Sequence, residues 1–309
     1  MENGWVYWSN WQGLSDVASG IQIQRGLGAS KLAVPSVGGT VTIVTKSTEK
    51  EEGGKLLSMV GNDGYMKNVV SYNSGVNENG WAASILMGRW SGDGYVNGTS
   101  GEGTTYFVSL GYKPSDEHAF NFTFTGAGQW HHQRTTRLSI RDFQNFGGDE
   151  EINRRFNADW GMLNGEEYNI RRNFYNKPIG TLNWDWNIKD NLSLSSSFYG
   201  SWGRGGGTGP RGNNFRNQVM DNFPFRRDLT SHVEAGRGTR VGPLDYIDFD
   251  AVVAENRATT QPYTGGAARG AYDGLLIGSN GFREDNVNRA VMIRRASVNS
   301  HDWYGAISN

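Results

Sequence analysis

The chain has 309 residues, including 44 glycines and no cysteine, and its net charge is −1. The lack of cysteine excludes a disulfide framework, thiol catalysis and thiolate metal sites. The balanced charge disfavours a nucleic-acid partner bound through a basic surface. Hydrophobic residues make up 36% of the chain, which together with glycine suits a folded protein. The apolar runs are far shorter than the roughly 20 residues of a membrane-spanning helix, so we expect no such helix.

The first fifty residues predict a small unit of two strands and a short helix. Residues 21–25 and 40–46 alternate apolar and polar side chains, as short strands do. Residues 26–32 have the small side chains of a turn entering a helix, and Pro35 ends it. A nucleotide-binding loop is disfavoured, because the third glycine of a Rossmann turn and the Lys-Ser/Thr pair of a phosphate loop are missing.

Several later segments alternate with a period of two, which predicts strands with one apolar and one hydrophilic face. The strongest patterns lie at residues 105–112, 120–125, 181–188 and 192–202. Weaker patterns lie at residues 55–62, 65–75 and 81–90. Seven strands therefore follow the first unit, and residues 303–305 begin an eighth.

The predicted connections alternate between short and long. Short turns are expected at residues 62–64, 77–80, 113–116 and 189–191, and longer connections at about 92–103, 126–177 and 203–300. Long unstructured loops are uncommon in compact soluble domains, whereas an outer-membrane barrel has short turns on one side and long loops on the other. We therefore expect an all-β fold, a partial transmembrane antiparallel β-barrel. A large soluble all-β domain is the alternative.

Aromatic residues in these strands fit the two girdles of a membrane barrel. Tyr106 and Tyr112 are six residues apart, about 20 Å along a strand, which approaches the roughly 25 Å between girdles. Trp184, Trp186 and Trp202 would lie at the level of the lipid head groups. The alternative is that these rings fill the core of a soluble sandwich.

The run from Ile21 to Lys31, followed by the run from Val34 to Lys46, resembles the end of the plug domain of TonB-dependent outer-membrane receptors. In that family a strand ending in Arg-Gly, a short Ala/Ser helix, a Gly-Gly pair and an Ile-Val-Thr-Lys strand lead into the first barrel strand. The resemblance covers about residues 1–50 by motif and the rest by its hairpins. It implies a C-terminal portion of a small α+β plug at 1–50 and an N-terminal portion of the barrel at 51–309. The plug residues with structural or gating roles would be Arg25, Gly26, Gly28, Gly38, Gly39 and Lys46.

The chain is short for such a receptor. Barrels of this family have about 22 strands, whereas this sequence supplies seven or eight, and Met1–Trp5 lacks the features of a signal peptide. The resemblance therefore implies a fragment of a longer receptor. We expect the isolated fragment not to form a functional barrel, because its two edge strands would remain unpaired.

The resemblance implies active uptake across the outer membrane of a scarce extracellular ligand, such as a ferric siderophore, haem, cobalamin or an oligosaccharide. The implied partners are a TonB-type energy transducer, whose contact segment is missing here, and outer-membrane lipid. Transport breaks no bond, so we expect no enzyme activity, no catalytic residue and no cofactor. The alternatives are a passive porin or adhesive barrel, and a secreted all-β domain that binds or hydrolyses glycans.

Ligand contacts are expected in the long connections, because binding residues concentrate in loops on a rigid scaffold. The richest cluster is Trp130, His131, His132 and Arg134, which we assign to an extracellular loop. Adjacent histidines suggest capture of haem or a metal. Neighbouring residues of an extended chain point in opposite directions, however, so we expect no metal bound between them.

Overall fold

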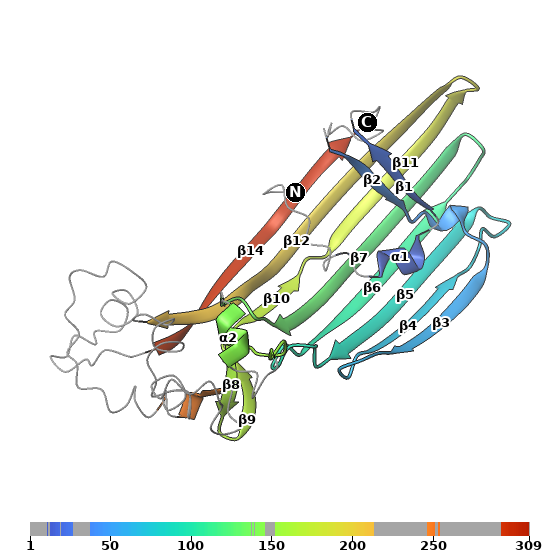
Figure 1. Ribbon diagram of the computed structural model, residues 1–309. Helices are drawn as coiled ribbons and strands as arrows, with labels where there is room; N and C mark the ends of the chain where they lie inside the picture. The colour runs from blue at the N-terminus through green and yellow to red at the C-terminus, as the bar shows by residue number, and fades with distance from the viewer. Residues whose placement is uncertain are drawn as a thin grey trace, which may run out of the picture.

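A computed structural model describes residues 11–26 except 12 and 19, 38–145 except 137 and 139, 152–212, 246–253 except 251 and 252, and 292–308. Within these ranges the chain is mostly antiparallel β-structure, in one nine-stranded sheet and two smaller sheets (Figure 1). The predicted all-β class is confirmed. None of the described helices is long and apolar enough to cross a membrane.

The nine-stranded sheet is an up-and-down meander in which almost every strand lies beside its neighbours in sequence (Figure 1). Its strands are β3 (Gly53–Val60), β4 (Met66–Asn73), β5 (Trp81–Gly92), β6 (Gly101–Tyr112), β7 (His118–His132), β10 (Arg172–Asn176), β11 (Ile179–Lys189), β12 (Leu192–Gly212) and β14 (Met292–Ser308). The strands β3 and β14 form its two edges.

The strands β10 and β11 form one interrupted strand. Arg172 pairs with His132 of β7 and Ile179 pairs with Thr125, so the register against β7 is the same on both sides of the interruption. The register against β12 is also continuous. Pro178 lies between the two halves, where it lacks the N–H needed for a ladder hydrogen bond. The sheet therefore has eight strand positions, within the predicted seven or eight.

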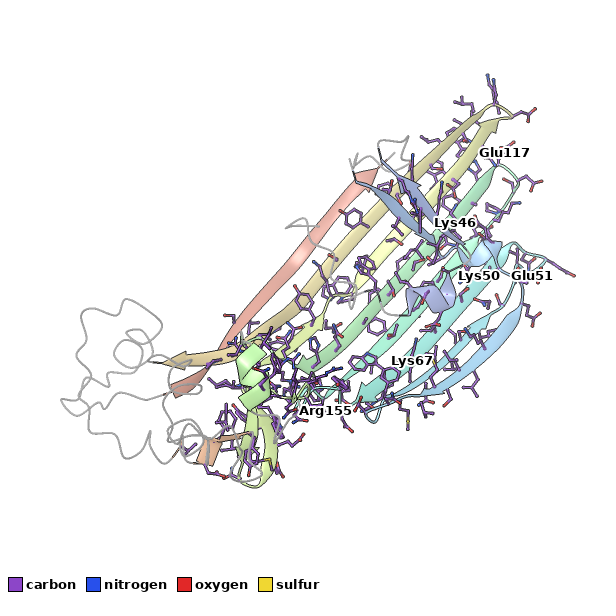
Figure 2. All side chains as sticks on the ribbon, viewed as in Figure 1. Lys46, Lys50, Glu51, Lys67, Glu117 and Arg155 are labelled. Carbon is purple, nitrogen blue, oxygen red and sulfur yellow. The ribbon has the colours of Figure 1, made fainter. Side chains whose placement is uncertain are left out.

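The two ends of the sheet carry different connections. We call them the turn end, which holds residues 74–80, 113–117 and 190–191, and the loop end, which holds residues 61–65 and 93–100 and where β7 and β12 end. Glu117 lies at the turn end and Arg155 at the loop end (Figure 2). The strands after which the sequence predicts the two longest connections, β7 and β12, therefore end at the same end of the sheet.

The strands β7 and β12 run further toward the loop end than the sequence predicts. Loops are expected from about residues 126 and 203, whereas these strands continue to residues 132 and 212. The glycines in both extensions do not form turns; they leave space for aromatic rings of neighbouring strands. A Cβ on Gly126 would lie 2.3 Å from the hydroxyl oxygen of Tyr106, and a Cβ on Gly205 would lie 2.3 Å from the ring of Tyr175.

The N-terminal elements lie against one face of the large sheet (Figure 1). They are α1 (Leu14–Val17), β1 (Gly20–Arg25), β2 (Gly39–Val44) and the 3-10 helix η2 (Ser47–Glu49). Both strands predicted for this unit are present, and β1 and β2 pair antiparallel. Gly39 has a φ of 112°, and a Cβ there would lie 2.2 Å from the carbonyl oxygen of Gln24, so the pairing requires glycine. Residues 27–32 of the expected turn and helix, with Gly28, lie outside the described residues.

Residues 133–171 include a small folded unit at the loop end. Its elements are α2 (Ile140–Asn145), β8 (Trp160–Leu163) and β9 (Glu166–Asn169), and β13 (Ile247–Asp248) pairs with β8. Asp159 is fully buried in this unit. Its carboxylate accepts hydrogen bonds from the backbone N–H groups of Thr135 (2.8 Å) and Thr136 (2.9 Å) and pairs with Arg171 at 3.2 Å. This part of the long connection therefore has its own polar core.

Candidate functional site

The large sheet has two faces with different surroundings. We call the face that contacts α1 and η2 the covered face, and the opposite face the open face. Along β6, Ser109 is fully buried on the covered face, whereas its neighbours Val108 and Leu110 are 39% and 47% exposed on the open face. The predicted alternation is therefore present, but its apolar side is the one left open. Soluble sheets bury that side.

Exposed apolar side chains continue across the open face on five neighbouring strands. They are Ile85 and Met87 of β5, Val108 and Leu110 of β6, Phe120 and Phe122 of β7, Leu182 of β11 and Phe198 of β12. The register places Val108 between Ile85 and Phe124, so the side chains form one continuous band. A contiguous apolar surface of this kind marks a contact with a membrane or another protein.

The five aromatic residues predicted as girdles lie in two rows near the two ends of this apolar band, level with Phe120 and Met87. Near the turn end the row holds Tyr112, Trp184 and Trp186. Nearer the loop end, Tyr106 and Trp202 both stack on the same phenylalanine ring of β7, with 5.7 Å between ring centroids in each case. Contact of these rings with lipid remains a prediction.

The covered face holds an apolar contact with α1. Leu14 and Val17 of this helix are buried against Val69, Leu86 and Phe107 of the sheet. Beside them, Asp16 pairs with Lys67 of β4 at 3.1 Å. A cavity of about 380 Å³ remains between the N-terminal elements and β4, β5 and β6. This contact is therefore small.

A polar contact holds η2 against the same face. The Ser47 hydroxyl is buried among hydroxyl and amide groups of β6 and β7, 3.4 Å from Ser109 Oγ and 3.3 Å from Asn121 Nδ2. Ser109 also donates to Asn121 Oδ1 at 2.9 Å. Gly111 leaves the space that η2 occupies, because a Cβ there would lie 2.7 Å from Ser47 Oγ. These buried polar groups therefore satisfy one another.

Lys46, one of the predicted plug residues, forms an ion pair with the covered face. Its ammonium group lies 2.6 Å from Asp185 of β11 and 3.6 Å from Glu49. Burial by itself lowers the pKa of Lys46, but the hydrogen bond and charge of Asp185 outweigh this effect and raise the pKa above its usual value. The N-terminal segment is thus held by contacts with several strands of the sheet.

The other predicted plug residues do not converge with Lys46 on one site. Arg25 ends β1 opposite Gly39, and Gly26 follows with a φ of 71°. Gly38 lies just before β2. Sequence reasoning missed Ser47, Asn121 and Asp185, although Asn121 and Asp185 lie on the hydrophilic sides of strands whose alternation is evident in the sequence.

The predicted loop cluster lies on β7 and is divided between both faces. Trp130 and His132 share the open face, with their ring centroids 5.2 Å apart, and His131 points to the covered face. Arg134 follows the strand and donates to backbone carbonyls of the loop unit. Assignment of Trp130, His131 and His132 to a loop is therefore wrong. In the described part of the chain, no group of three or more His, Cys, Asp or Glu side chains is arranged to hold a metal ion.

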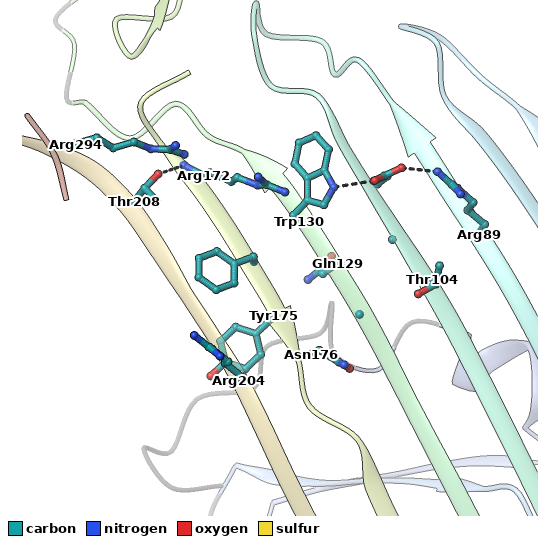
Figure 3. Close-up of a pocket in the computed structure, with 14 residues that line it drawn as sticks. Arg89, Thr104, Gln129, Trp130, Arg172, Tyr175, Asn176, Arg204, Thr208 and Arg294 are labelled. Atoms are coloured by element: carbon teal, nitrogen blue, oxygen red, sulfur yellow. Dashed lines mark hydrogen bonds and ion pairs between the residues drawn. The ribbon is translucent and has the colours of Figure 1, made fainter. Parts of the chain in front are cut away.

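A cavity of about 810 Å³ opens at the loop end of the sheet, beside Trp130 (Figure 3). Trp130 Nε1 donates to Glu102 at 2.9 Å, and Arg89 donates to the other oxygen of Glu102 at 2.6 Å. The guanidinium group of Arg172 lies over the Trp130 ring, 4.3 Å from its centroid. Arg204 and Arg294 also line the cavity.

Comparison of the sequence with protein-family models gives no match, and comparison with curated proteins gives none either. Among solved structures, the chain is similar to the siderophore receptor PiuA from Acinetobacter baumannii, with 14% sequence identity and a TM-score of 0.44. The similarity covers 62% of this chain and 27% of that chain. It describes a weak structural relation to part of a receptor.

Proposed function

We propose that this chain is part of an outer-membrane receptor for TonB-dependent active uptake of a scarce ligand. The observation that carries the proposal is the sidedness of the sheet: an apolar face lies open between two aromatic rows, and the opposite face is covered by the N-terminal segment. A membrane barrel has this arrangement, with apolar side chains toward lipid and polar side chains toward the lumen. The motif in residues 21–46 supports the same proposal independently.

The contacts of the N-terminal segment suit a plug that moves. The contacts at Lys46 and Ser47 are an ion pair and hydrogen bonds, which water can replace at little net cost. A large apolar contact would resist separation, because its exposure to water costs free energy in proportion to its area. Force applied to the plug would therefore open a path along the covered face, while the strands stay paired.

Two alternative functions are less well supported. A passive porin or adhesive barrel requires no segment held against its covered face. A secreted glycan-binding domain requires no exposed apolar band, which in water would promote aggregation. The proposed ligand is a ferric siderophore, haem, cobalamin or an oligosaccharide, and uptake assays with each class identify it.

A disulfide lock between plug and sheet tests the proposal. The chain has no cysteine, and the hydroxyl oxygens of Ser47 and Ser109 are 3.4 Å apart, so the double variant Ser47→Cys/Ser109→Cys can form a single bridge. In the full-length receptor, expressed in cells, the oxidised variant should bind ligand but take up none. A reductant should restore uptake.

The matched control joins two strands of the sheet and leaves the N-terminal segment free. Ser109 and Thr123 face each other across β6 and β7, with their hydroxyl oxygens 3.3 Å apart, so Ser109→Cys/Thr123→Cys should bridge without loss of uptake. Normal uptake by the oxidised Ser47→Cys/Ser109→Cys variant, with the bridge verified by mass, would contradict the proposal.

A further inference from the structure

We propose that the cavity at the loop end of the open face binds the phosphate groups of an anionic lipid through Arg172, Arg204 and Arg294. The inference rests on the proposed membrane location and concerns a surface that takes no part in the proposed uptake route. Its ligand would be a lipid of the surrounding leaflet.

The arginines reach the cavity from separate strands on one face of the sheet. Arg172 belongs to β10, Arg204 to β12 and Arg294 to β14, and the cavity extends past Trp130 to Arg89 of β5. Figure 3 shows Arg294, Arg172, Trp130 and Arg89 in a row across the strands. Residues distant in sequence therefore form one basic surface.

The positive charge of this surface is mostly unbalanced. Among the described residues that line the cavity, Glu102 is the one carboxylate, and its two oxygens already accept hydrogen bonds from Arg89 and Trp130. Among the described residues, Arg172, Arg204 and Arg294 form no ion pair with a carboxylate. The Nε of Arg172 is also buried without a hydrogen-bond partner in the described part of the chain. Grouped like charges and a buried donor without a partner both favour a bound anion.

The position of the cavity favours a lipid over a soluble anion. On the open face the cavity follows directly after the aromatic row of Tyr106 and Trp202, and Glu102 is four residues from Tyr106 along β6, about 14 Å. Aromatic rows in membrane barrels lie at the head-group level. Arginines just beyond such a row meet lipid phosphates, while the acyl chains lie along the apolar band.

The shape and chemistry of the cavity suit a phosphorylated head group. Gly128 contributes no side chain to the floor, and the volume of about 810 Å³ is within the usual range for small-molecule sites. Guanidinium groups bind phosphate through paired hydrogen bonds, which a neutral head group cannot accept as charge-assisted bonds. We therefore expect the phosphate groups to be required for binding.

Native mass spectrometry of the purified, delipidated full-length receptor in a neutral detergent tests the inference. Diphosphorylated lipid A and its dephosphorylated form serve as matched probes. The receptor should bind the phosphorylated lipid about tenfold more tightly or better, as expected for charge-assisted hydrogen bonds. The double variant Arg172→Gln/Arg204→Gln should lose this preference. The variant Lys189→Gln, which removes an exposed charge at the turn end, should keep it.

Equal binding of both lipids by the wild-type receptor would overturn the inference, and this comparison does not depend on the variants folding. Competition by inorganic phosphate at the same concentration as lipid A would also overturn it, because the site would then be one for the free anion. If the wild-type full-length receptor takes up none of the candidate ligands but still prefers the phosphorylated lipid, the proposed function alone is contradicted. Normal uptake with no lipid preference would contradict this inference alone.

Discussion

The two faces of the large sheet are built from the same strands and differ in what they bury. On β6, Ser109 is fully buried beside Ser47 and Asn121, whereas Val108 and Leu110 on either side of it are partly exposed. In water this arrangement is unfavourable, because exposed apolar area costs about 25 cal/mol per Å² and buried polar groups need partners. The covered face supplies those partners. The open face is suited to a surrounding that is itself apolar.

The comparison also separates two ways of stabilising the molecule. The covered face uses a small apolar cluster, hydrogen bonds and ion pairs between the N-terminal segment and the strands. The open face has aromatic stacking and an apolar band without a covering segment in the described part of the chain. Variants that act on one face and leave the other intact therefore test the assignment.

The largest effect is expected for Leu86→Ala on the covered face. Leu86 is 1% exposed and packs in the cluster with Leu14 and Val17, so the variant leaves a cavity and should lower the free energy of unfolding by about 2–5 kcal/mol. Ile85→Ala, at the adjacent open-face position, should cost much less in detergent, which fills the gap. Denaturant unfolding of both variants measures the difference, and equal losses would remove the distinction between the faces.

A charge at the centre of the open band should have the next largest effect. Val108→Arg should lower the stability of the protein in lipid bilayers by about 2–4 kcal/mol if this position lies near the bilayer midplane. The same change at a half-exposed site in water costs little, about 0.5 kcal/mol or less. Glu78→Arg, in the exposed turn at residues 74–80, is the control and should be nearly neutral. Unchanged stability of Val108→Arg in bilayers would argue against lipid contact.

Removal of a shared polar partner should release the N-terminal segment. Asn121→Ala removes the hydrogen bonds that Asn121 forms with Ser47 and Ser109. It should lower the free energy of unfolding by about 1–3 kcal/mol, since the buried hydroxyls lose their partner. Hydrogen exchange at residues 46–49 should become faster, while exchange within β6 and β7 changes little. Asn79→Ala, in an exposed turn, provides the control. Faster exchange in β6 and β7 with unchanged exchange at residues 46–49 would show that Asn121 stabilises the sheet and does not hold the N-terminal segment.

The smallest effect is a pH dependence from Lys46. Its pKa is raised in the folded state, so its pair with Asp185 stabilises the fold below the ordinary lysine pKa of 10.5 and is lost as the pH rises through the folded value. Because both side chains are 31% exposed, we expect the ion pair to contribute under about 1 kcal/mol to the free energy of unfolding. Asp185→Asn should flatten the stability profile above about pH 10. An unchanged profile would assign no stability to this pair.

Several strands were predictable from the sequence, and their ends were not. Alternation such as Phe120, Phe122 and Phe124 identifies a strand, because side chains of a strand point to opposite faces in turn. The glycine-rich extensions carry no such pattern: Gly126 and Gly205 are needed for rings that belong to other strands. Local patterns therefore locate the middle of a strand better than its end.

The candidate site was predictable only in part. Lys46 was identified through the motif that contains it, whereas its partner Asp185 is 139 residues away in sequence. The basic cavity joins arginines from β5, β10, β12 and β14. Short-range sequence patterns do not predict which residues of distant strands lie side by side. Trp130 is predicted in a loop because the glycine-rich end of β7 lacks the alternation by which the rest of the strand is recognised.

By itself, the sequence determined the all-β class, the alternating faces and the hairpin order, because these depend on residues close together in the chain. Only the tertiary structure decided which face is covered, which polar groups hold the N-terminal segment, and how the open face gathers its arginines. Those features depend on register across several strands. Strand pairing places residues that are distant in sequence side by side. The backbone hydrogen bonds that set this register do not depend on the type of side chain, so the sequence alone does not reveal the pairing.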